Sequence, residues 1–179
     1  MTVPVSLLPL KCLRCEAPVP AAPQERAWIC QQCAQGLLLD PDQGLLPLEV
    51  HYAAGIPENA PGRPFWIAQG SVSLDRKAYG FGSQDRASQE FWNTPRQFVI
   101  PAFDCQLVNL LELGVTLLEA PLALTPGKAV PFAPVVRLPA DLHALAEFIV
   151  VAVEAERKDQ VRQILFNLQL SEPQLWVLP

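Results

Sequence analysis

The sequence contains no apolar run long enough to form a membrane-spanning helix. Such a helix needs about 20 mostly apolar residues, and the nearest approach is Phe-Ile-Val-Val-Ala-Val at residues 148–153. The first ten residues lack a basic start, and two prolines interrupt their short apolar stretch, so they do not resemble a secretory signal peptide. We therefore expect a cytoplasmic protein with no membrane span.

Basic residues are also few. The 179 residues carry a net charge of −5, and only 17% of them are charged. Residues 1–50 hold three basic and five acidic side chains, and residues 51–179 hold ten and thirteen. Nucleic-acid affinity comes largely from Lys and Arg side chains that neutralise phosphates, and the sequence has no basic run. This balance argues against nucleic acid as the main partner.

Histidine is scarce, and the only two, His51 and His143, fall in different predicted elements. His51 lies on a predicted strand, and His143 lies on the polar side of a predicted helix. An isolated histidine in such a place is more often a surface or core residue than a catalyst. The sequence therefore offers no catalytic arrangement built on histidine.

Two other groups are the remaining candidates for catalysis. Cys105 stands at the start of a predicted helix, where the helix N-terminus can lower a thiol pKa. The alternative is a buried cysteine that packs like an apolar residue, and no basic partner is evident nearby. The acidic residues Glu154, Glu156 and Asp159 end a later predicted helix. A solvated helix end paired with neighbouring basic residues explains them more simply than a hydrolytic carboxylate pair.

The strongest signal lies between residues 12 and 33. Two Cys-x-x-Cys pairs, Cys12/Cys15 and Cys30/Cys33, are separated by fourteen residues. Pairs at that separation form a tetrahedral four-thiolate metal site when the intervening segment folds back as a β-hairpin. Four thiolates suit zinc or a single iron. Because the protein fills all four positions, such a site is structural and has no place for a substrate.

This stretch resembles the zinc ribbon family, whose ligands correspond to the same four cysteines. The resemblance covers no more than the first quarter of the chain, and it indicates metal binding without indicating a function. Knuckles of this kind often have Gly directly after the second cysteine, where a positive φ is easy. Here Glu16 and Ala34 occupy those positions.

Three alternatives to zinc stay open at this point. The cysteines could form disulfides, although a chain without an export signal keeps such cysteines reduced. A redox-active Cys-x-x-Cys is the second alternative, and its duplication at ribbon spacing argues against it. A rubredoxin-like iron centre is the third, and the loop between the pairs is short for that family. We favour structural zinc.

The best candidate for a linker is the segment 54–64, which is rich in proline and glycine. We predict a zinc ribbon at residues 1–53, a linker at 54–64 and an α+β domain at 65–179. In that domain we expect two helices packed on a mostly antiparallel sheet. The expected elements are strands at 65–74 and 96–103, an exposed loop at 75–89, helices at 104–119 and from Pro139, and a strand at 164–170 that forms a hairpin with 175–178.

The clearest predicted helix begins at Pro139 and has apolar residues on more than one side. Leu142, Leu145, Ile149 and Val153 belong to one apolar face. Phe148 and Val151 point elsewhere, so a second helix or a partner must cover them. If they are exposed, we expect them to form a docking site.

These observations rank three classes of function. A structural-zinc protein-interaction module or non-catalytic subunit comes first, because half of the residues are apolar and no catalytic constellation is evident. Its partner would be another protein or a second copy. A nucleic-acid-associated ribbon protein comes second, on the family resemblance alone. An enzyme that uses Cys105 or the acidic helix end comes third.

Overall fold

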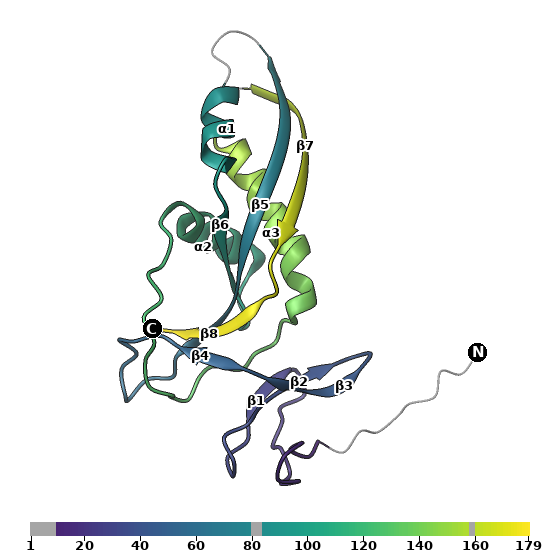
Figure 1. The fold of residues 1–179 in the computed structure, drawn as a ribbon, viewed down its shortest axis with the longest axis vertical. Helices are drawn as coiled ribbons and strands as arrows, with labels where there is room; N and C mark the ends of the chain where they lie inside the picture. Colours follow the sequence, from purple (N-terminus) through teal and green to yellow (C-terminus); the bar gives the residue numbers. More distant parts are fainter. Residues whose placement is uncertain (1–9, 80–83, 158–159) are drawn as a thin grey trace, which may run out of the picture.

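The computed structural model describes residues 10–79, 84–157 and 160–179, and Figure 1 shows how their strands and helices are arranged. A three-stranded sheet at the N-terminal end carries the cysteine cluster. A five-stranded sheet follows, and helices pack against it. The predicted α+β class is confirmed. None of the helices in these ranges is both long and apolar enough to cross a membrane.

The small sheet consists of β1 (Ala27–Ile29), β2 (Gly36–Asp40) and β3 (Gly44–Leu48), paired antiparallel in that order. Its two faces contact different cores. Leu37 is buried among the cysteines, whereas Leu38 belongs to the main core of the protein. The sheet therefore connects the cysteine cluster to the rest of the molecule.

The large sheet consists of β4 (Val50–Tyr52), β5 (Arg63–Tyr79), β6 (Arg96–Pro101), β7 (Gln160–Leu170) and β8 (Gln174–Leu178). The long β5 pairs antiparallel with β6, β7 and β8, while β4 and β8 are parallel. The expectation of a mostly antiparallel sheet is confirmed. Where β6 and β8 flank β5, apolar side chains are buried on both faces of the sheet.

Three helices occur in the described part of the chain: α1 (Asp85–Trp92), α2 (Leu107–Glu119) and α3 (Leu142–Ala155). A 3-10 turn at Pro139–Asp141 leads into α3, so the helix start expected at Pro139 is found. The face of α3 that is buried in the main core includes Leu142, Ala146, Ile149, Val150 and Val153.

The helices α2 and α3 approach closely at Gly114. A Cβ atom at this position would lie 2.4 Å from Cδ1 of Ile149, which no real packing allows. Glycine therefore costs α2 some intrinsic helix stability but permits the contact between the two helices. Figure 1 shows α1 and α3 running beside the long β5–β7 pair.

The exposed loop predicted at residues 75–89 is wrong where the structure describes it. The strand β5 continues to Tyr79, and Asp85–Trp92 form α1. Residues 80–83 of that predicted loop lie outside the described residues. The sequence analysis expected two helices in this domain and missed α1. This helix is mostly polar in sequence, and contacts with residues far away along the chain hold it in place.

Two smaller expectations also need correction. The strands β7 and β8 form no hairpin, since both pair with β5 on the same edge, one after the other. Ser171 lies between them and still bonds to Gln69 of β5, so the chain continues along that edge instead of reversing. The helix expected at residues 104–119 begins later, since α2 starts at Leu107 after Gln106.

The small sheet packs directly on the α+β part of the chain. Ala27 and Leu38 are buried in the main core, and the backbone N–H of Arg26 donates to the carbonyl oxygen of Val135 at 2.7 Å. The strand β4, which lies within residues 1–53, belongs to the large sheet. The division into residues 1–53, 54–64 and 65–179 stays a prediction that proteolysis can test.

Candidate metal centre

The two Cys-x-x-Cys turns have the same backbone geometry. In each turn the N–H of the first cysteine donates to the carbonyl oxygen five residues later, Cys12 to Ala17 and Cys30 to Gln35, both at 2.8 Å. A second bond returns from four residues later to the carbonyl of the first cysteine. This repeated turn points both sulfurs of a pair to the same side.

The four sulfur atoms converge in one cluster. Sγ of Cys12 lies 3.5 Å from Sγ of Cys33, and Sγ of Cys15 lies 3.5 Å from Sγ of Cys30. All four sulfurs lie within 4.8 Å of one another. A tetrahedral ion with Zn–S bonds of about 2.3 Å would separate its sulfurs by about 3.8 Å. The cluster could therefore hold a metal ion with little adjustment and is consistent with a zinc site.

The positions after the second cysteines adopt the backbone conformation that usually calls for glycine. Glu16 has φ 60° and Ala34 has φ 58°. A left-handed residue with a side chain costs roughly 1–2 kcal/mol. Both turns are therefore strained at the residue after the second cysteine, and this backbone conformation accompanies the inward direction of the sulfurs.

The first cysteine of each turn ionises more readily than the second. A hydrogen bond from the backbone N–H of Cys15 is the main cause that lowers the pKa of the Cys12 thiol to about 6. The N–H of Cys33 lowers the pKa of the Cys30 thiol in the same way. Burial opposes both shifts because it disfavours the charged thiolate.

The second cysteines show the opposite shift. At Cys15 the backbone N–H of Ala17 acts to lower the thiol pKa, but burial and the neighbouring thiols outweigh it and raise the pKa to about 12. At Cys33 the N–H of Gln35 is likewise outweighed by burial and by the Cys12 thiol, so the pKa is raised. Each turn thus pairs a thiol whose pKa is lowered with a thiol whose pKa is raised, and a bound cation would displace the protons that the thiols still carry.

Apolar side chains shield the cluster from the side of the small sheet. Trp28 and Leu37 are buried against Cys12 and Cys30. The Trp28 indole is fixed in place because its Nε1–H donates to Glu25 at 2.9 Å. None of the five cysteines is in a disulfide. The arrangement suits a closed structural site rather than an open catalytic one.

Comparison with protein-family models, with curated proteins and with solved structures finds no match for this chain. The assignment of the cluster therefore rests on the spacing of its cysteines and on their geometry.

Neither histidine belongs to the cysteine cluster, and each contacts residues elsewhere in the protein. His51 stacks on Trp176 with ring centroids 4.9 Å apart. His143 is exposed on α3, where its Nδ1 lies 3.6 Å from Glu147 and its Nε2 lies 3.3 Å from the carbonyl of Leu168. These contacts agree with the structural roles expected from the sequence.

Cys105 is half-buried and packs against the main core. It precedes α2 by two residues instead of lying in its first turn. Its carbonyl oxygen accepts a hydrogen bond from Arg137 at 2.9 Å, and the same guanidinium group also bonds to the carbonyl of Phe103. Arg137 thus fixes the backbone of this segment, and the Cys105 side chain packs against apolar neighbours as a small apolar residue would.

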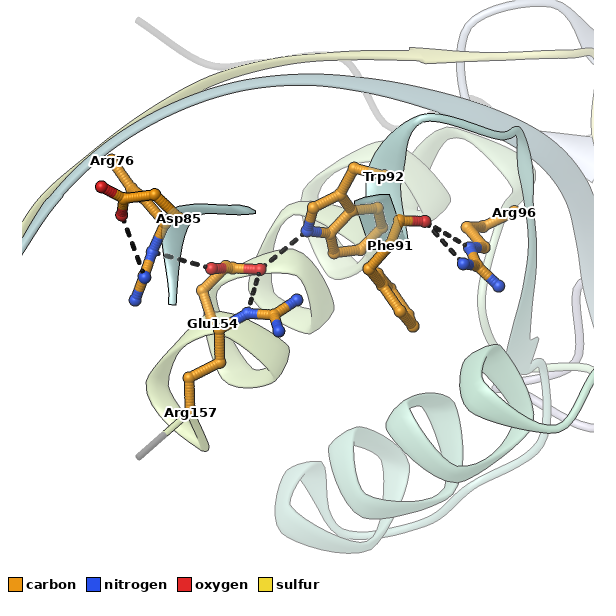
Figure 2. A network of polar contacts seen from close by, with 7 residues as sticks. All are labelled: Arg76, Asp85, Phe91, Trp92, Arg96, Glu154 and Arg157. Carbon is orange, nitrogen blue, oxygen red and sulfur yellow. Dashed lines mark hydrogen bonds and ion pairs between the residues drawn. The ribbon is translucent and has the colours of Figure 1, made fainter. Parts of the chain in front are cut away.

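The solvated acidic helix end expected at α3 is wrong for Glu154. This carboxylate is fully buried, at 0% exposure, and accepts hydrogen bonds from Trp92 Nε1 and Arg157 Nε, both at 2.8 Å (Figure 2). Glu156 is exposed, and Asp159 lies outside the described residues. The predicted pairing within the helix is present, but it serves a buried network.

Arg76 of β5 completes this network. Its side chain is 2% exposed, and its Nε lies 3.0 Å from Glu154 Oε2. This is a close ion pair whose angles fall outside hydrogen-bond geometry. Arg76 also contacts Asp85 at 3.3 Å. The network therefore ties α1, α3 and β5 together around the buried charges of Arg76 and Glu154.

Phe148 and Val151 are exposed on α3, at 56% and 43%. Together with Ala144 and Phe166 they line a shallow hollow of about 230 Å³. We call these four residues the α3 patch. The exposure on which the expected docking site depended is therefore present in this structure.

Proposed function

We propose that the protein is a zinc-stabilised interaction subunit that binds another protein and has no catalytic role of its own. The single observation that supports this proposal most is the α3 patch, an apolar surface that no described residue covers. Monomeric proteins seldom leave large apolar side chains clustered on one exposed helix face.

Zinc is the metal that suits the cysteine cluster best in this proposal. Soft thiolates in tetrahedral array favour zinc, and a single iron is the alternative that the same ligands would accept. The residues that would hold the ion are Cys12, Cys15, Cys30 and Cys33. The resemblance to zinc ribbons supports the same assignment. Thiolate ligands of this kind persist in a reducing compartment, so we also propose a cytoplasmic location.

The role of the ion would be to hold the N-terminal turns in shape. The small sheet is too small to bury a core of its own, and its cysteine side contributes few large apolar residues. Metal binding in pieces of this size is worth on the order of 10 kcal/mol apparent, so folding and metal binding are coupled.

The charge of the patch region favours a protein over nucleic acid. Glu147 lines the same hollow as Phe148 and Val151, and no basic residue lines it. The whole chain carries a charge of −5. A phosphate backbone would be repelled here, whereas an apolar side chain of a protein partner would fill the hollow.

The test begins with identification of the proteins that co-purify with the tagged chain in its native host, followed by reconstitution with the purified partner. We expect Phe148→Asp to weaken that binding by about tenfold or more, because buried aromatic anchors carry about 2 kcal/mol or more of binding energy. Val108→Asp is the matched control, since Val108 is exposed to a similar extent, 54%, on α2.

Two results would overturn the proposal. The first is equal binding by the wild type and the Phe148→Asp variant. The second is the absence of a stoichiometric protein partner together with salt-dependent binding of DNA or RNA at micromolar concentration, which would favour the nucleic-acid alternative.

A further inference from the structure

One edge of β5 loses its neighbour partway along the strand. β6 pairs with β5 from Phe65 to Gly70 and no further, because the chain leaves the sheet before Arg96. On the opposite edge, β7 accompanies β5 to Tyr79. Beyond Gly70, one edge of β5 is paired with β7, and the other edge no longer pairs with β6.

The alternation of backbone directions shows which residues face the open edge. The Pro64 carbonyl accepts a bond from Ala102 on the β6 side, whereas Gln69 bonds to Ser171 on the β7–β8 side. In an antiparallel ladder successive residues alternate between the two edges. Val72 and Leu74 consequently direct their N–H and C=O groups to the edge of β5 that pairs with β6 only as far as Gly70. In residues 10–79, 84–157 and 160–179, none of the hydrogen bonds reaches these groups.

A hollow of about 470 Å³ lies along this edge, and we call it the edge slot. One wall is β5 at residues 71–74 with the paired residues Asn167 and Gln169 of β7, and the facing wall is the end of α1 with the turn at residues 93–95. Its volume lies in the range of roughly 300–1,000 Å³ that is common for binding pockets. The lining side chains are uncharged, and most are polar amides or hydroxyls: Ser71, Ser73, Gln89, Asn93, Thr94, Asn167 and Gln169.

The buried network around Glu154 holds the facing wall of the edge slot, the end of α1, in place. Trp92 lines the slot, and its indole N–H is bonded to the buried Glu154 at 2.8 Å (Figure 2). Arg96 donates to the carbonyl of Phe91 at 2.9 and 2.5 Å and lies 4.0 Å above the Phe91 ring. These contacts fix both ends of the turn, so the slot is formed before anything binds.

We propose that the edge slot binds an extended, uncharged peptide segment of a partner protein, which adds as a strand to β5 at residues 72–74. This inference rests on the interaction role proposed above and gives the chemical class of a partner. The unpaired N–H and C=O groups match the backbone of an extended strand. The absence of charged side chains in the lining disfavours a charged segment, which would lose its hydration without gaining a counter-ion.

Amide hydrogen exchange at single-residue resolution tests the open edge in the metal-loaded full chain. The amides of Ser71 and Ser73 face β7 and should exchange slowly, whereas those of Val72 and Leu74 should exchange fast. Equal protection of all four amides in the monomer would overturn the proposal, because the edge would then be covered.

A selection supplies the probe for binding. Short capped peptides built only from Thr, Val, Ser, Asn, Gln and Leu are displayed and selected on the purified protein, and the tightest one is synthesised. Its binding should slow exchange at Val72 and Leu74 by about tenfold or more, as expected for strand addition. N-methylation of alternate peptide amides should abolish binding in one register and leave the other unaffected. Failure to select any peptide, or insensitivity to N-methylation, would overturn the proposal.

A variant that fills the slot gives an independent test. Thr94 is exposed on the turn, so Thr94→Trp should block peptide binding without disturbing the core. Thr116→Trp, at an exposed position on α2, is the matched control and should bind as the wild type does. If Thr94→Trp binds the peptide as well as the control, the site is wrong. If the wild type self-associates in sedimentation and Thr94→Trp does not, the occupant is a second copy and the peptide proposal fails.

Different results would overturn the edge-slot proposal and the proposed function. Phe148→Asp should leave peptide binding unchanged, because the α3 patch and the edge slot share no residue. Loss of partner binding in Phe148→Asp without any peptide binding would overturn the slot and keep the interaction role. Peptide binding with an unaffected partner affinity in Phe148→Asp would support the slot and overturn the role of the patch.

Discussion

The buried carboxylate of Glu154 offers a quantitative test of how α1, α3 and β5 are held together. We consider Glu154→Gln, which keeps the shape of the side chain and removes its charge. The amide oxygen can still accept the bond from Trp92, which is 2.8 Å away in the wild type. The interactions that lose strength are those with Arg157, 15% exposed, and with Arg76, 2% exposed.

The expected loss of stability is about 3 kcal/mol. Removal of one partner from a buried ion pair typically costs about 3–5 kcal/mol, since the other charge stays buried. The lower end applies here because Arg76 keeps its contact with Asp85 and because its contact with Glu154 lacks good hydrogen-bond geometry. For a chain of this size, each kcal/mol lowers the thermal midpoint by about 2–4 °C, so we expect a decrease of about 6–12 °C.

The assay is thermal and urea unfolding of the metal-loaded protein, followed by circular dichroism and tryptophan fluorescence. Glu90→Gln is the matched control, because Glu90 is exposed and pairs with the exposed Arg86 on α1. Exposed pairs of this kind contribute little, so the control should unfold like the wild type. A decrease for Glu154→Gln no larger than that of the control would refute the account of the network.

Three further predictions concern the N-terminal part of the chain. Removal of the metal with a chelator should lower the thermal midpoint, and added zinc should restore it, because the ion holds the cysteine turns together; an unchanged midpoint would contradict a structural role. Ala34→Gly should raise stability by about 1 kcal/mol, since it relieves a left-handed φ that costs an L-residue that much, and a loss in urea unfolding would contradict this strain. Limited proteolysis should cut the exposed segment 55–61, but the fragments should remain associated because Ala27 and Leu38 are buried in the main core; separation of the fragments would show an independent ribbon.

The parts of the structure that follow from local sequence could be predicted well. The spacing of the cysteine pairs predicts the convergence of their sulfurs, and the turns do fold as a repeated unit. The spacing of Leu142, Ile149 and Val153 predicts α3 and its buried face. Exposure of Phe148 and Val151 follows from the same helical period, because they lie outside that face.

The parts that failed depend on contacts between distant residues. The helix α1 has few apolar residues, and its anchor is the bond between Trp92 and Glu154, which lie 62 positions apart. No local pattern reveals that a glutamate at a charged helix end is buried. The turn residues at 171–173 suggest a hairpin, yet Ser171 bonds to Gln69 and the chain continues along β5. The edge slot arises from the same long-range pairing and was invisible in the sequence.

X-ray absorption spectroscopy of the purified, reduced protein reports directly which atoms surround the metal. We expect one zinc ion per chain with four sulfur neighbours at about 2.3 Å and no oxygen or nitrogen neighbour. The absorption edge also distinguishes zinc from iron. A metal with an oxygen or nitrogen ligand in place of a sulfur would contradict the closed four-thiolate site formed by Cys12, Cys15, Cys30 and Cys33, and so would a protein that holds no metal.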